Sequence, residues 1–239
     1  MIAQAYLTEW AARAPWPQQT QIEQDLILSR LIVEIANHDL LGAEFAFRGG
    51  TCLHKLHLPR QLRYSEDLDY VRRTRSGIKP YLSALREVAL GAGLVEHGTT
   101  QSGRMVHIVF DTQATDAAGR IRVKIEANIE ETESFLPRIT RHFAVDSRWW
   151  SGRADVSTFT LEELMSTKLR ALYQRRKGRD LFDLWHALAD LGLNEQLVVD
   201  GLVHYMRDDI FSYSEYAQRQ TVCAARVNGP SRLRRRECL

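Results

Sequence analysis

Apolar residues with helical spacing occur near both ends of the chain, and short alternating runs lie between them. Two helical patterns follow Thr20 and Thr160, and each threonine precedes a glutamate by three residues, which is typical of a capping box. Further helices are predicted over residues 2–13, 51–57, 79–92, 179–191, 195–207 and 214–225. Strands are predicted over residues 44–48, 68–71, 105–111 and 121–129.

This order of elements predicts an α+β protein with two parts. Strands and helices mix up to about residue 130, whereas helices alone follow residue 160. We therefore expect a mixed-sheet core with N-terminal helices over residues 1–150, and an all-helical domain with a basic tail over residues 151–239. Residues 135–159 are interpreted as the connection between them.

Composition narrows the class of protein. The chain has 239 residues, of which 44% are hydrophobic and 26% charged, as in ordinary soluble globular proteins. Its three cysteines lie far apart, so neither a disulfide framework nor a zinc site is indicated. No apolar run reaches the roughly 18 residues of a membrane span, and the first residues lack the basic region of a secretory signal. We therefore expect a cytoplasmic protein without membrane association.

Positive charge is concentrated in two stretches, although the net charge is only +2. Residues 226–239 carry five arginines against one glutamate, and residues 48–75 carry seven Lys/Arg against three acids. Such blocks suit a polyanion such as RNA. A solvated surface and an unstructured tail are the simpler alternative.

Gly49 and Gly50 separate a predicted strand from a predicted helix. Glycines let the backbone approach an anion closely, and the start of a helix offers free N–H groups, so this junction is typical of a phosphate site. Thr51 could add a hydroxyl, and Lys55 follows one turn later. Taken alone, the glycine pair is a weak signal, because most such pairs form only a turn.

Asp67 and Asp69 are two residues apart in a predicted strand, so their side chains project from the same face. Close carboxylates repel each other and are best accommodated with a divalent cation between them, which phosphoryl and nucleotidyl transfer require. Glu126 lies on the polar face of the strand over residues 121–129. If the two strands are neighbours, three carboxylates meet, and Glu126 would serve as a metal ligand or general base. Solvated acids at a sheet surface are the alternative.

Lys168 falls on the apolar face of the helix that follows Thr160, where its ammonium needs an anionic partner. That partner could be a substrate phosphate, or else Asp180 or Asp183 in the next predicted helix. Four basic residues at the junction of these helices could touch nucleic acid: Arg175, Arg176, Lys177 and Arg179.

Together these motifs resemble those of the AbiEii/AbiGii toxin family, which includes the MenT toxins, within the DNA polymerase β-like nucleotidyltransferase superfamily. The matching residues, in order over roughly residues 20 to 190, are Gly49-Gly50-Thr51, Leu53 and Lys55; Arg63, Ser65, Asp67, Leu68 and Asp69; Glu126; Lys168 and Ala171; and Arg179, Asp180 and Asp183. The resemblance implies that residues 1–150 form a nucleotidyltransferase core.

The resemblance also implies a function. It is that of a metal-dependent nucleotidyltransferase toxin, paired with an AbiEi-like antitoxin, that transfers NMP from an NTP to an RNA and blocks translation. The acceptor would be a tRNA 3′ end. Asp67 and Asp69, with Glu126, would hold Mg²⁺ or Mn²⁺, Lys168 would bind the phosphates, and Asp183 would be the fourth signature residue. The further nucleotide contacts would be Gly49, Gly50, Thr51, Lys55, Ser65 and Asp180. Ser65 occupies a position where family members can be phosphorylated.

Two other functions use the same residues. A nucleotidyltransferase could modify a hydroxyl of a small molecule or of a protein, and the carboxylates would not differ. A non-catalytic binding module is disfavoured because Asp67, Asp69, Lys168 and Asp183 are all present. The basic segments favour an RNA acceptor.

Overall fold

The computed structural model describes residues 2–115 and 119–206. The predicted helix over residues 214–225 and the basic tail over residues 226–239 lie outside the described residues. The helices are α1 (Gln4–Trp10), α2 (Gln19–Asn37), α3 (Asp39–Glu44), α4 (Gly49–Cys52), α5 (Lys79–Gly91), α6 (Leu161–Arg175), α7 (Gly178–Asp190) and α8 (Glu195–Tyr205), with a π-helical turn η1 (Leu53–His57). The strands are β1 (Phe45–Arg48), β2 (Asp67–Arg72), β3 (Val95–Ser102), β4 (Met105–Gln113), β5 (Arg120–Asn128), β6 (Ile139–Asp146) and β7 (Ser151–Thr158).

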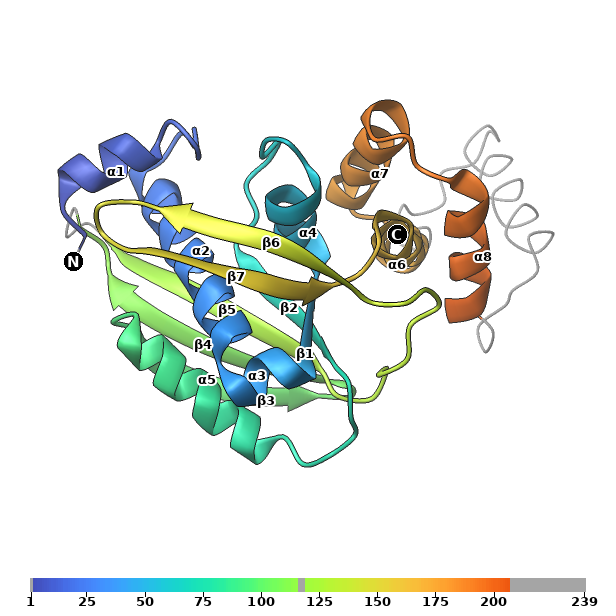
Figure 1. Cartoon of the computed structure of the whole chain (residues 1–239), viewed down its shortest axis with the longest axis horizontal. Helices are drawn as coiled ribbons and strands as arrows, with labels where there is room; N and C mark the ends of the chain where they lie inside the picture. Colours follow the sequence, from blue (N-terminus) through green and yellow to red (C-terminus); the bar gives the residue numbers. More distant parts are fainter. Residues whose placement is uncertain (1, 116–118, 207–239) are drawn as a thin grey trace, which may run out of the picture.

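All seven strands belong to one mixed sheet, in the order β3-β4-β5-β2-β1-β7-β6. The pairs β2–β5 and β1–β7 are parallel and the others antiparallel. Helix α2 packs against β5, β6 and β7, while α6, α7 and α8 gather beside one end of the sheet (Figure 1). The α+β class and the C-terminal helices are therefore confirmed.

The interpretation of residues 135–159 as a connection is wrong, because β6 and β7 form a hairpin there that extends the sheet. Strand β3 was also missed by the sequence pattern. Both β3 and β6 are edge strands, and most of their side chains are exposed. An edge strand needs few apolar residues, so its sequence lacks the alternation that marks a buried strand.

The helix starts agree in part with the predicted capping boxes. Helix α2 begins at Gln19, and its box is formed by Gln18 and Gln21 rather than by Thr20 and Glu23. Thr160 caps α6 as expected, since its hydroxyl accepts from the Glu163 N–H at 3.2 Å. The Glu163 carboxylate, however, accepts from the backbone N–H groups of residues 135 and 136 instead of closing the box.

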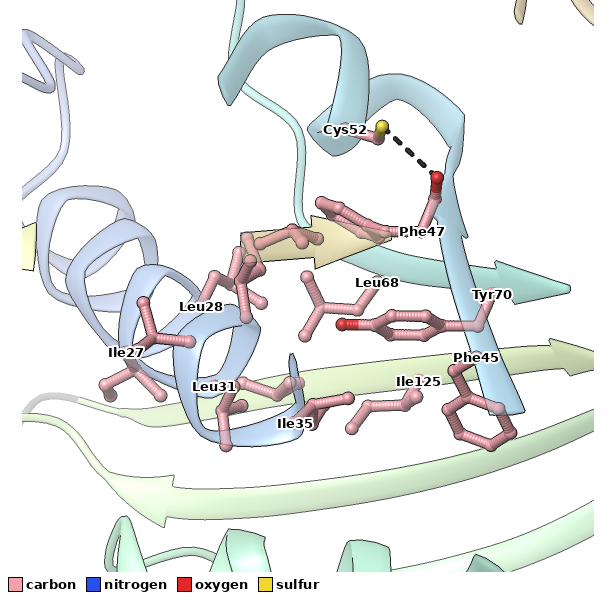
Figure 2. Close-up of a cluster of buried hydrophobic side chains, with 14 of the residues drawn as sticks. Ile27, Leu28, Leu31, Ile35, Phe45, Phe47, Cys52, Leu68, Tyr70 and Ile125 are labelled. Carbon is pink, nitrogen blue, oxygen red and sulfur yellow. Dashed lines mark hydrogen bonds between the residues drawn. The ribbon is translucent and has the colours of Figure 1, made fainter. Parts of the chain in front are cut away.

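The main core lies between α2 and the sheet. Figure 2 shows the side chains that pack there: Ile27, Leu28, Leu31 and Ile35 of α2 against Phe45 and Phe47 of β1, Leu68 and Tyr70 of β2, and Ile125 of β5. Burial of such side chains stabilises the fold by roughly 1.5–3 kcal/mol each. Because alternate strand residues face opposite sides, this packing decides which residues of β2 and β5 face away from α2.

No helix in the described ranges is both long enough and apolar enough to cross a membrane.

Candidate functional site

Three carboxylates meet on the sheet face opposite the α2 core. Strands β2 and β5 are parallel neighbours, with Asp69 opposite Glu126 and Asp67 opposite Lys124. Leu68 and Ile125 point into the core, so the acids on either side of them face outward. The predicted adjacency of the Glu126 strand and the Asp67 strand is confirmed.

The carboxylates are close enough to affect each other's ionisation. Burial, together with the negative charges of Glu126 and Asp67, raises the pKa of Asp69 to about 7. Burial alone would also raise the pKa of Glu126, but a hydrogen bond and ion pair with Lys124 outweigh it and lower that pKa. Within the cluster, the pKa of Asp69 is therefore raised while that of Glu126 is lowered.

Lys124 bridges two of these acids. Its Nζ lies 3.2 Å from Asp67 Oδ2 and 2.5 Å from Glu126 Oε1, and His107 Nδ1 lies 3.1 Å from the same Glu126 oxygen. With the side chains so arranged, no three His, Cys, Asp or Glu residues of the described chain converge to hold a metal ion. Lys124 was given no role from the sequence, although strand alternation places it on the same polar face as Glu126.

Gly49 and Gly50 lie directly against side chains of the segment that carries the two aspartates. Gly49 has φ +85°, and a β-carbon there would overlap the Asp69 carboxylate. A β-carbon at Gly50 would come within 2.7 Å of Arg63 Nη2 and 2.9 Å of Ser65 Oγ. Within the chain, the group that lies closest to Gly49 is therefore the Asp69 carboxylate, and the predicted contact of the glycines with a phosphate stays a prediction.

Two predicted nucleotide contacts are contradicted. The buried Thr51 hydroxyl donates to the Asp67 backbone carbonyl at 2.6 Å, so it supports the strand rather than facing a ligand. Lys55 is also buried, with its Nζ 3.0 Å from both Asp25 carboxylate oxygens and 2.9 Å from Ser29 Oγ. An acid from α2, 30 residues away, thus satisfies Lys55 in the interior.

Asp183 is the centre of a second ionic cluster. Its fully buried carboxylate lies 2.6 Å from Lys168 Nζ, 2.8 Å from Arg63 Nε and 3.1 Å from His54 Nε2. Burial would raise the pKa of Asp183, but these donors together hold it well below the usual range. His54 Nδ1 accepts from the Leu62 N–H, so Nε2 carries the proton donated to Asp183. Burial also lowers the pKa of His54, which keeps the imidazole neutral.

Both clusters border one cleft of about 700 Å³. Its charged lining residues are the basic Arg48, Arg63, Arg104, Lys124, Lys168, Arg170, Arg175, Lys177 and Arg179, and the acidic Asp67, Asp69, Glu126, Glu131 and Asp180. Gly49, Gly50 and Ser65 also line it, whereas Thr51, Lys55 and Asp183 do not. Asp183 therefore acts on the cleft through Lys168 and Arg63.

The model for the nucleotidyl transferase AbiEii toxin family of type IV toxin–antitoxin systems matches residues 30–231, which include every residue of the cleft. The chain belongs to the AbiEii family. It is thus a nucleotidyltransferase toxin of a toxin–antitoxin system, with an NTP substrate and an antitoxin partner.

Solved structures share the AbiEii fold. MenT4, a nucleotidyltransferase toxin from Mycobacterium tuberculosis H37Rv, is 21% identical, with a TM-score of 0.61 over 83% of this chain and 68% of its own. JHP933 from Helicobacter pylori is 15% identical, with a TM-score of 0.53 over 80% of this chain and 76% of its own. No curated protein sequence matches significantly.

The four basic residues at the α6–α7 junction of this AbiEii chain differ in their surroundings. Arg175 pairs with Asp180 at 2.9 and 3.0 Å, so the Asp180 carboxylate in the cleft is already engaged. Lys177 and Arg179 line the cleft, and no carboxylate of the described chain lies within ion-pair distance of either. Arg176, which follows the last residue of α6 with a left-handed backbone of φ 52°, does not line the cleft.

Proposed function

We propose that this AbiEii protein transfers an NMP unit from an NTP to an RNA 3′ end, with the tRNA acceptor end as substrate. The observation that carries the proposal is the cleft itself, in which three carboxylates, Lys168 and two close-packed glycines share one opening. Carboxylates and a positioned lysine are the groups that phosphoryl-transfer sites use. Loss of functional tRNA would block translation in the cytoplasm, and the AbiEi-like antitoxin would counter this.

A divalent cation is part of the proposal, and the donor set fits one. Asp67, Asp69 and Glu126 present hard oxygen ligands at a half-buried surface, and burial together with repulsion from the other two acids raises the pKa of Asp69. These residues would hold Mg²⁺ or Mn²⁺. When bound, the metal would neutralise the triphosphate and favour ionisation of the attacking hydroxyl.

The remaining residues would bind and orient the nucleotide. Lys168 is buried apart from the end that reaches the cleft, and its ammonium is fixed by Asp183 at 2.6 Å. A cation fixed in this way can bind a phosphate without first losing side-chain freedom. Gly49, Gly50 and Ser65 line the same part of the cleft, so we place the triphosphate between them and Lys168.

The charge of the side chains that line the cleft supports RNA as the acceptor. Nine basic residues against five acidic ones line the cleft, so a polyanionic acceptor fits it better than a cationic small molecule. Lys177 and Arg179 lie on the Lys168 side of the opening, where α6 passes into α7. A phosphate backbone whose 3′ end enters the cleft would meet them.

Labelling tests this proposal directly. The purified protein is incubated with Mg²⁺, each α-labelled NTP in turn and total tRNA, and the products are separated on a denaturing gel. We expect one or more NTPs to label tRNA, and Asp67→Asn to abolish the label. Label on a protein or small molecule but not on RNA would overturn the acceptor assignment alone. No labelled product with any NTP or acceptor would overturn the proposal as a whole.

A further inference from the structure

Lys124 occupies the position that a cation between Asp67 and Glu126 would take. The register of β2 and β5 sets Lys124 opposite Asp67, and strand alternation puts it on the same face as Glu126. Its ammonium lies within 3.2 Å of the one and 2.5 Å of the other, so a single positive charge joins acids from two strands. Lys124 therefore substitutes for a bridging ion in the metal-free protein.

An ammonium placed between two carboxylates competes with a divalent cation for that position, because the two positive charges repel each other at close range. Mg²⁺ requires oxygen ligands at about 2.0–2.1 Å in near-octahedral geometry. The oxygens that face Lys124 are already committed to N–H donors, and the described acids do not converge as a metal site. A metal that bridges the two acids through Asp67 Oδ2 and Glu126 Oε1 therefore requires Lys124 to move.

The side chain is able to move. Lys124 is 37% exposed and lines the cleft, so its ammonium can leave the acids without crossing the protein interior. The ion pairs of Lys124 are partly exposed, so solvent screens them and the cost of breaking them is reduced. In contrast, Lys168 is only 8% exposed and is held at Asp183, so the two lysines of the cleft differ in freedom.

We propose that Lys124 is a displaceable internal counter-ion of the carboxylate cluster. It holds Asp67 and Glu126 together while no metal is present, and it competes with a divalent cation for them. The metal then binds well only together with an NTP, because the triphosphate supplies further ligands and an anionic partner for the displaced ammonium. This inference rests on the proposed metal-dependent function and makes Lys124 a positioning residue.

Metal binding without nucleotide tests the proposal. Mn²⁺ affinity is measured by electron paramagnetic resonance on the full chain as wild type, Lys124→Met and Lys124→Arg. We expect Lys124→Met to bind Mn²⁺ at least tenfold more tightly than wild type, and Lys124→Arg to remain near wild type. The matched control is Lys177→Met, which removes an equal charge from the lining of the same cleft away from the acids and should change Mn²⁺ affinity by less than threefold.

The dependence on nucleotide supplies a second readout. A non-hydrolysable NTP analogue should increase the Mn²⁺ affinity of wild type by a larger factor than that of Lys124→Met, since the variant has no ammonium to displace. Equal Mn²⁺ affinity in wild type and Lys124→Met, or an equal gain in Lys177→Met, would overturn the inference. Circular dichroism checks that each variant is folded, and Lys124→Gln takes the place of Lys124→Met if the latter is not.

The inference and the proposed function fail differently. If Asp67→Asn loses Mn²⁺ binding and transfer while Lys124→Met binds Mn²⁺ like wild type, only the role of Lys124 is wrong. If Asp67→Asn retains both Mn²⁺ binding and transfer, the metal assignment within the proposed function is wrong, and the inference falls with it.

Discussion

Two ionic clusters border the same cleft, and their charges are balanced in opposite ways. On β2 and β5, three carboxylates share Lys124 and His107, and the pKa of Asp69 is raised. Around Asp183, one carboxylate receives two cations and a neutral imidazole, and its pKa is lowered.

The two clusters therefore differ in what they can bind. The three acids of β2 and β5 can still take up a cation, whereas the Asp183 carboxylate already has a full set of donors. The three acids repel one another, so a cation entering the cleft relieves an unfavourable interaction. Asp183 already has strong donors and is sealed from solvent, so it holds Lys168 and Arg63 in place. The two cationic side chains then present positive charge to the opening from a rigid base, as binding of an anion requires.

The largest effect on stability is expected from removing Asp183, the centre of the second ionic cluster. Asp183→Ala leaves Lys168 and Arg63 without their counter-ion in a buried setting, which costs about 3–5 kcal/mol of unfolding free energy. Because the pKa of Asp183 is lowered in the folded protein, its contribution is present above the ordinary carboxyl pKa of about 4 and is lost below it. In urea unfolding, wild type should therefore have a higher midpoint than Asp183→Ala at neutral pH, and the difference should become smaller in acid. Equal midpoints at neutral pH would show that Asp183 does not stabilise the fold.

Lys168→Met tests whether the Asp183 cluster contributes to catalysis as well as to stability. His54 and Arg63 still satisfy Asp183 in this variant, so we expect a modest loss of stability. Transfer should slow by about 10²–10³-fold, the usual loss when a charge-stabilising group is removed from a transfer site. Single-turnover rates and thermal melts on the same samples separate the two effects. A lower melting temperature with an unchanged rate would make Lys168 purely structural.

The contribution of the carboxylate cluster to stability should change with pH in the opposite direction to that of Asp183. Asp69 keeps its proton up to about pH 7 in the folded protein but loses it near pH 4 when unfolded, so its contribution to stability declines as pH rises through this interval. Asp69→Asn avoids this penalty and should be more stable than wild type by about 1–3 kcal/mol at about pH 8 without metal, after allowance for solvent screening.

The same gain should disappear near pH 4, and Mg²⁺ should stabilise wild type more than Asp69→Asn. Thermal melts with and without Mg²⁺ at both pH values measure all four combinations. A variant that is less stable than wild type at high pH would show that the acids do not repel each other.

The smallest effect is expected at the rim of the cleft. Lys177→Glu should weaken tRNA binding several-fold and reduce the salt dependence of log K by about one, with little change in NTP affinity. Arg176→Glu is the matched control, since Arg176 neighbours Lys177 but does not line the cleft. Arg175 is unsuitable because its change would also break the pair with Asp180. Filter binding at several salt concentrations measures the tRNA affinity of both variants. Equal effects of Lys177→Glu and Arg176→Glu would show that the cleft rim at Lys177 is not a specific binding surface for the acceptor.

Much of the site was predictable from local sequence because periodicity alone assigns residues to faces. Alternation places Asp67 and Asp69 together, and helical spacing places Lys168 on a buried stripe that demands an anion. The Gly49-Gly50 pair between an alternating run and a helical run marks a junction where the backbone can approach an anion closely. These are properties of a few consecutive residues, so they do not depend on how the chain packs.

Pairing between distant residues depended on the tertiary structure. Lys55 had the spacing of a phosphate ligand, yet docking of α2 supplied Asp25 and buried the pair. Asp183 and Lys168 could have been a pair or separate ligands, and the packing of α7 on α6 brought them together. His54 of η1 and Arg63 of the segment before β2 joined them from more than a hundred residues away. The edge strands β3 and β6 belong to the sheet through backbone pairing, which leaves little trace in side-chain pattern.

The amino-acid sequence by itself determined which chemical groups the protein carries and which face of each element presents them, since both follow from residue type and backbone period. Only the tertiary structure decided which charges neutralise one another. Strand register set Lys124 between Asp67 and Glu126, and helix docking enclosed Asp183 among its donors. The physical reason is that ion pairs form over a few ångströms, so the partner of a charge is set by the packing of segments that lie far apart in the chain.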